Sequence, residues 1–159
     1  PRQGKIDYDV DGKLVGNWFL EGTNGYAGAG STMDYWGGHL AVVPNFVDPT
    51  FWHFSIGDWQ GVATQFGITP AQDPATVGVE TGLIKYELKQ EELYDADTGQ
   101  RWMTNTGPIK NPKGRVIGSV KGTVLLQLIE ARKLKVETFP GKTGAEVTGF
   151  TANAKIYER

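Results

Sequence analysis

Short segments rich in β-branched and aromatic residues recur along this chain, with glycine, proline and aspartate between them. The pattern is clearest in the last third, where three such segments follow one another: Arg115–Ile129, Lys133–Phe139 and Ala145–Tyr157. In the second segment, charged residues alternate with Leu134 and Val136, which is typical of an antiparallel strand with one buried face. No stretch of about ten residues carries the apolar stripe of an amphipathic helix. We therefore expect an all-β fold with little helix.

Four segments nearer the N-terminus have the same strand character: Lys13–Glu21, 38–46, 50–58 and 82–95. In the last one KQEEL also suits a helical turn, but the alternation in LIKYEL favours a strand, on which the adjacent Glu91 and Glu92 face opposite sides. The turn signals between segments, such as Val47-Asp48-Pro49 and Pro140-Gly141, are short. About eight strands joined by short turns predict an antiparallel up-and-down β-barrel, because closure removes the edges that an open sheet would expose.

The length of 159 residues fits a single domain, residues 1–159, that is large enough to bury a core. Its 22 glycines are about twice the usual share, which agrees with many tight turns. A net charge of −2 provides no broad basic surface, so nucleic acid is not an expected partner. Charged residues interrupt every apolar stretch before the roughly 18 residues that a membrane span needs, and the lack of cysteine excludes disulfides and thiolate metal sites.

Residues 7–12 read DYDVDG and combine three alternating aspartates with a glycine. Asp7, Asp9 and Asp11 match positions 1, 3 and 5 of a calcium-binding loop, and Gly12 matches the turn glycine at position 6. Position 12 of such a loop is a bidentate glutamate, whereas this chain has Trp18 there. We therefore favour an Asp-Gly turn that starts the first strand, and we keep Ca²⁺ bound by the three aspartates as the alternative.

Aromatic residues concentrate between Tyr35 and Trp59, a segment that holds seven of the 18 tryptophan, tyrosine and phenylalanine residues and both histidines. In TFWHFSIGD the apolar face, with Trp52 and Phe54, is expected to line the barrel interior, and His53 to point outward or toward a rim. Large aromatic surfaces beside a few polar groups are typical of a small-molecule pocket, although a plain aromatic core fits the pattern equally well.

The function predicted from these residues is non-enzymatic binding of a small apolar or aromatic ligand within the β-barrel. The residues expected to contact the ligand are Trp18, Tyr35, Trp36, His39, Trp52 and Phe54. An alternative is a cyclase or isomerase in which His39 or His53, or a tyrosine, transfers a proton. Its carboxylate partners would be Asp34 and Asp58. A third reading is a structural or interaction module of a secreted protein, which allows a homo-oligomer.

Residues 16–19, GNWF, follow KLV on the first expected strand and resemble the glycine-x-tryptophan-aromatic signature of lipocalins and related calycin barrels. The resemblance implies a calycin-like barrel with a ligand site. It also implies an arginine late in the chain that packs across Trp18, and Arg132 and Arg159 are the candidates. The threonine-aspartate-tyrosine turn and the C-terminal helix of lipocalins are missing.

A second likeness extends over most of the chain. The order GNWF, GHL, VDP, FSIG and FPGKTGAEVTGF is similar to that of uncharacterised β-rich domains in secreted bacterial proteins. This likeness implies export and the binding of a ligand or a surface. A sequence that begins with Pro1 rather than methionine agrees with it, so we expect a secreted or periplasmic location.

Overall fold

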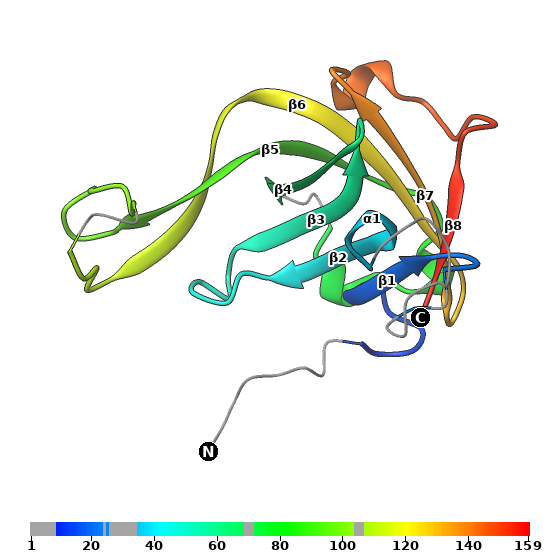
Figure 1. Cartoon of the computed structure of the whole chain (residues 1–159), viewed down its shortest axis with the longest axis horizontal. Coiled ribbons are helices and arrows are strands. Elements are labelled where there is room, and N and C mark those ends of the chain that lie inside the picture. Colours follow the sequence, from blue (N-terminus) through cyan, green and yellow to red (C-terminus); the bar gives the residue numbers. More distant parts are fainter. Residues whose placement is uncertain (1–8, 24, 26–34, 69–71, 104–106) are drawn as a thin grey trace.

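The structure, a computed structural model, describes residues 9–23, 25, 35–68, 72–103 and 107–159. Eight strands form one closed barrel, in which each strand pairs antiparallel with the next in sequence and the last pairs with the first (Figure 1). The prediction of an all-β, up-and-down barrel with little helix is therefore confirmed. None of the helices in these ranges is long and apolar enough to cross a membrane.

The eight strands vary widely in length. They are β1 (Gly16–Leu20), β2 (His39–Pro44), β3 (Trp52–Trp59), β4 (Val62–Ile68), β5 (Ile84–Asp95), β6 (Pro112–Glu130), β7 (Lys133–Pro140) and β8 (Lys155–Glu158). The helical elements whose bounds are described are one short helix and three single 3₁₀ turns. They are α1 (Tyr35–Gly38), η2 (Pro74–Thr76), η3 (Val79–Thr81) and η4 (Gly144–Glu146).

Two parts of the strand prediction differ from the structure. The sequence predicts one strand over Ala145–Tyr157, but only β8 at its end is a strand. The loop before β8 is held by side chains instead, since the Glu137 carboxylate accepts hydrogen bonds from the backbone N–H and the hydroxyl of Thr151. The prediction also omits β4, which forms a tight hairpin with β3 through a turn whose Gly61 has a φ of 86°.

Apolar side chains from all eight strands fill the barrel interior as one core cluster. On β3 the interior residues are Phe54, which is 0% exposed, and Ile56, which is 3% exposed, as the alternation predicts. Trp18 on β1 is also fully buried in this cluster. The inward face of each strand is therefore used for packing.

Arg159 lies across Trp18 at the place where β8 meets β1. Its guanidinium carbon is 3.6 Å from the centroid of the indole ring. The same guanidinium donates to the carbonyl oxygens of Val15, at 3.1 Å, and of Lys13. Trp18 in turn donates its indole N–H to the Leu14 carbonyl at 2.8 Å. Because β1 and β8 share only two residue pairs, these contacts strengthen the closure of the barrel.

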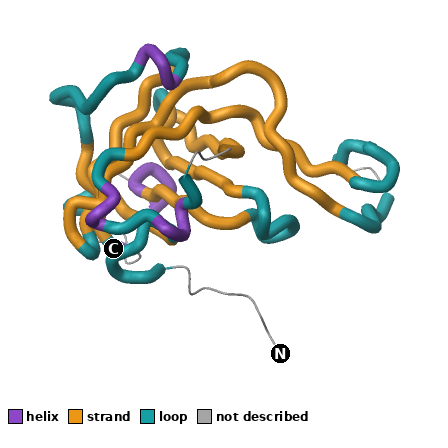
Figure 2. The backbone as a smooth tube through the Cα atoms, turned by 180° about the vertical axis from the view of Figure 1, so that it is seen from behind, coloured by secondary structure: helices purple, strands orange, loops and turns teal. Residues whose placement is uncertain are grey.

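The outer halves of β5 and β6 extend beyond the barrel as a two-stranded arm. The two strands stay paired as far as Asp95 and Pro112, whereas β5 pairs with β4 only near Gly67 and Ile68. Figures 1 and 2 show from opposite sides how this pair runs out from the barrel body. Residues 90–103 and 107–117 are termed the β5–β6 arm below.

We expect Arg159→Gln to lower the free energy of unfolding by about 2–3 kcal/mol, because it removes charge-assisted hydrogen bonds to two carbonyls and the contact with Trp18. Urea denaturation measures the change. Arg132→Gln is the matched control, since Arg132 forms only an exposed ion pair with Asp11 at 3.7 Å and should change stability by less than about 0.5 kcal/mol. Equal effects of the two substitutions would contradict the role given to Arg159.

Candidate functional site

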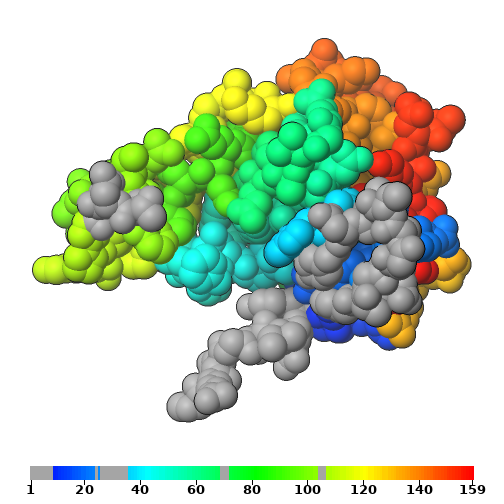
Figure 3. Space-filling view, viewed as in Figure 1, coloured from blue at the N-terminus to red at the C-terminus, as the bar shows by residue number. Residues whose placement is uncertain are grey.

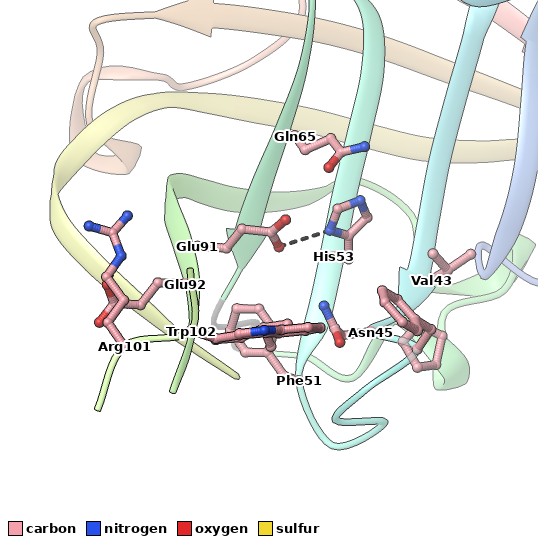
Figure 4. Close-up of a pocket in the computed structure, with 12 residues that line it drawn as sticks. Val43, Asn45, Phe51, His53, Gln65, Glu91, Glu92, Arg101 and Trp102 are labelled. Atoms are coloured by element: carbon pink, nitrogen blue, oxygen red, sulfur yellow. Dashed lines mark hydrogen bonds and ion pairs between the residues drawn. The ribbon is translucent and has the colours of Figure 1, made fainter. Parts of the chain in front are cut away.

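A pocket lies on the outside of the barrel wall, between the β2–β3 turn and the β5–β6 arm (Figure 4). Its volume is about 490 Å³. It is lined by Val43, Pro44, Asn45, Phe46, Phe51, His53, Gln65, Glu91, Glu92, Leu93, Arg101 and Trp102. In the space-filling view the cyan β2–β3 turn and the green arm adjoin on one face of the molecule (Figure 3). The site therefore combines two hairpins that are remote in sequence.

Phe51 fixes the distance between these two hairpins. Its ring packs where Gly67 of β4 and Gly114 of β6 have no side chain. A β-carbon on Gly67 would lie 2.4 Å from Cζ of Phe51, and one on Gly114 would lie 2.6 Å from its Cγ and Cδ1. Both distances are shorter than real carbon contacts, so the ring can occupy this place only because both residues are glycine.

Asp48 adds a polar link at the same place. Its carboxylate, 4% exposed, accepts hydrogen bonds from the Thr50 hydroxyl at 2.6 Å and from the Gly114 backbone N–H at 2.9 Å. Lys113 approaches to 3.8 Å. Burial alone would raise the pKa of Asp48, but the bonds from Thr50 and Gly114 and the charge of Lys113 outweigh it and lower that pKa. The turn predicted from Val47-Asp48-Pro49 thus also binds the β5–β6 arm, through the contacts of Asp48 with Gly114 and Lys113.

His53 and Glu91 form an ion pair across the pocket wall. Nδ1 of His53 lies 2.8 Å from Oε2 of Glu91, and the two side chains are 15% and 23% exposed. A carboxylate can only accept, so Nδ1 carries the proton and donates. Nε2 is the atom left for another molecule, since it has no hydrogen bond to any residue that the structure describes. Figure 4 shows the ring beside Gln65.

Glu92 lies between two arginines at one end of the pocket. Nε of Arg101 lies 3.1 Å from one carboxylate oxygen, as an ion pair. Arg115 donates through Nε at 2.6 Å to the other. Glu92 is 7% exposed, whereas Arg101 is 51% exposed. The carboxylate therefore positions the Arg101 guanidinium at the rim.

Asn45 has a fixed orientation at the other end of the pocket. Its Oδ1 accepts hydrogen bonds from the backbone N–H groups of Val47, at 2.8 Å, and Asp48, at 3.2 Å. These bonds belong to the β2–β3 turn and decide which way the amide faces. The Nδ2 group points away from the turn and up toward the pocket in Figure 4.

The residues predicted to bind a ligand do not lie together in the structure. Trp18 and Phe54 are both 0% exposed in the core, and Trp52 is partly buried against it. Trp36, on α1, is 65% exposed. Tyr35 begins α1, and its side chain lies outside the described residues.

His39 lies on the outer face of β2. Its Nε2 is 3.0 Å from Oδ1 of Asn17, and its ring centroid is 5.5 Å from that of Phe19. Burial lowers the pKa of His39, and the nearby charge of Asp9 opposes the shift. His39 does not line the pocket described above.

The structure pairs His53 with a carboxylate that the sequence did not indicate. Asp34 lies outside the described residues, and Asp58 instead accepts from the Gly61 N–H at 2.9 Å and from Lys155 at 3.3 Å. Glu91 is 38 residues away from His53 along the chain, so no local spacing connects them. Glu91 and Glu92 are consecutive on β5 and have different partners, His53 for Glu91 and the two arginines for Glu92, and both line the pocket.

The acidic segment before β1 uses its described carboxylates in contacts with the barrel. Oδ1 of Asp9 accepts the Asn17 N–H at 2.6 Å, and Asp11 pairs with Arg132. Asp7 lies outside the described residues. Gly12 has a φ of 79° and donates its N–H to Ala131 at 2.8 Å, so Asp11-Gly12 is a turn. Among the described residues no three His, Cys, Asp or Glu side chains are grouped to hold a metal, and Ca²⁺ stays a prediction.

Comparisons with known proteins give no assignment. No protein-family model matches the chain, and neither a search of curated proteins nor one of solved structures finds a similar protein. What the pocket does is therefore inferred from its own geometry.

Gly67→Ala tests the packing that forms the pocket. We expect the added methyl group to lower the free energy of unfolding by about 1–3 kcal/mol, since it meets Phe51 at 2.4 Å and Val116 at 2.8 Å. Gly149→Ala is the control, because a β-carbon there meets no described atom within 4 Å. That control should be neutral or slightly stabilising. Urea denaturation of both variants gives the comparison, and a neutral Gly67→Ala would contradict the packing argument.

Asp48→Asn tests the polar link and its pH dependence. Because the folded-state pKa of Asp48 is lowered, its carboxylate contributes stability above the unfolded value of 3.8 and loses it as the pH falls through the folded value. We expect the variant to be about 1–3 kcal/mol less stable at neutral pH. The difference from wild type should shrink below about pH 4. Urea denaturation over a pH series measures this, and a difference that stays constant into acid would contradict it.

Proposed function

We propose that the protein binds a small, largely apolar or aromatic ligand without catalysis, in the pocket between the β2–β3 turn and the β5–β6 arm. The observation that carries this proposal is the lining of the pocket, where aromatic surfaces lie next to a few polar groups with fixed orientation. A volume of about 490 Å³ is in the range of small-molecule sites. The scaffold is a closed barrel, which holds both hairpins in place.

This proposal places the ligand outside the barrel wall, whereas the sequence predicts it within the barrel. Eight strands enclose a space just wide enough to be filled by side chains or to hold one small ligand. Here the core cluster, with Trp18 and Phe54 at 0% exposure, occupies that space. The pocket outside offers aromatic surface that is still accessible, since Trp102 is 42% exposed and Phe46 is 88% exposed. Covering this surface supplies the favourable free energy of binding.

We further propose that the barrel is related to the calycin barrels that the GNWF segment resembles. The contact between Arg159 and Trp18 supports this, because a late arginine across the tryptophan of the first strand is what the resemblance implies. The secreted or periplasmic location and a homo-oligomer stay predictions. The alternative of proton transfer also stays open, with Glu91 as the partner of His53 in place of Asp34 or Asp58.

The neutral fluorescent probe N-phenylnaphthylamine tests the proposed pocket. We expect saturable binding by wild type, and a roughly tenfold weaker affinity for Trp102→Ala, which is about 1.4 kcal/mol. The reason is the loss of an aromatic surface that the probe would cover. Trp36→Ala is the matched control, because Trp36 is also exposed but does not line the pocket. No saturable binding, or equal weakening by both substitutions, would contradict the proposal.

A further inference from the structure

The acceptor groups of the pocket are mostly in use. Both oxygens of Glu92 are paired with arginines, and Oε2 of Glu91 is bonded to His53. Oδ1 of Asn45 accepts from the β2–β3 turn. Among the described side chains of the lining, one oxygen of Glu91 and the amide oxygen of Gln65 stay open, and the Glu91 oxygen belongs to a carboxylate that is already paired with an imidazole. A ligand that brings donors therefore finds few acceptors here.

Several donor groups of the pocket, in contrast, have no hydrogen bond to any described residue. Arg101 forms an ion pair with Glu92 in which Nε approaches to 3.1 Å, and its two terminal nitrogens have no hydrogen bond to any described residue. Nδ2 of Asn45 has no such bond within the described ranges either. Figure 4 shows Arg101 and Asn45 on opposite sides of the Trp102 ring. Donors thus flank the aromatic surface at both ends.

The charges near the pocket do not exclude an anion. Glu91 and Glu92 carry two negative charges, and Arg101 and Arg115 balance them with two positive ones. The terminal nitrogens of an arginine held through Nε form a planar pair that matches a carboxylate.

From these contacts we infer that the pocket takes small amphipathic acids, meaning molecules with a flat apolar or aromatic body and a carboxylate. The body covers Trp102 and Phe51, and the carboxylate accepts hydrogen bonds from the terminal nitrogens of Arg101. Asn45 donates to an oxygen at the other end of a ligand that has one there. This inference rests on the proposed function, because it names the class of ligand for the same pocket.

The experiment compares naphthoate with naphthamide, which share the ring system and differ in charge, by calorimetric titration. We expect wild type to bind naphthoate at least tenfold more tightly than naphthamide. Arg101→Gln should lower the affinity for naphthoate about tenfold and leave that for naphthamide unchanged, since only the acid uses the guanidinium. Arg132→Gln removes an arginine of similar exposure outside the pocket and should change neither affinity.

Three results would overturn the inference. Equal affinities of wild type for the acid and the amide would show that the pocket does not recognise the carboxylate, while saturable binding of both would leave the proposed function standing. Equal weakening of both ligands by Arg101→Gln would show that Arg101 supports the pocket rather than the acid. If naphthoate, naphthamide and N-phenylnaphthylamine all fail to bind, the proposed function fails together with the inference.

Discussion

The packing of Phe51 between Gly67 and Gly114 is the contact on which the pocket depends. The two glycines belong to β4 and β6, and the aromatic ring comes from the β2–β3 hairpin, so one side chain joins three parts of the fold. Asp48 ties the same turn to the backbone of Gly114. His53 pairs with Gly67 and Gly67 with Lys89, so the sheet brings Glu91 of β5 near His53. The geometry of the site is therefore set jointly by strand pairing and by the packing of Phe51.

The barrel and the pocket divide the roles of scaffold and binding site. Interior positions on all eight strands are used by the core cluster, and Arg159 strengthens the closure beside Trp18. Outward-facing residues of β2, β3 and β4 are then free to form one wall of a site, and the arm supplies the other. Changes in the arm can alter the pocket without disturbing the core, in keeping with the general rule that function resides in sites carried on folds.

The sequence predicted those features that local patterns control. Alternation along β3 placed Phe54 inside and His53 outside, and Val47-Asp48-Pro49 predicted the β2–β3 turn. It did not predict the pairing of His53 with Glu91, because 38 residues separate them and a bulge near Leu88 redirects β5 before Glu91 is reached. It also missed that the segment before β8 is a loop, since alternation does not show that Thr151 donates to Glu137 on β7, 14 residues earlier.

Affinity and selectivity come from different groups in the proposed site. The free energy of binding is expected mainly from covering Trp102 and Phe51, because each apolar Å² removed from water contributes about 25 cal/mol whatever the polar end of the ligand. Selectivity for an acid comes from Arg101, which is 51% exposed and keeps its terminal nitrogens hydrated when a neutral ligand is bound. A neutral ligand therefore leaves no buried donor unsatisfied, and the penalty for it stays small. The preference for acids therefore comes from the bonds that the carboxylate gains at Arg101, and the site should tolerate a range of flat apolar bodies.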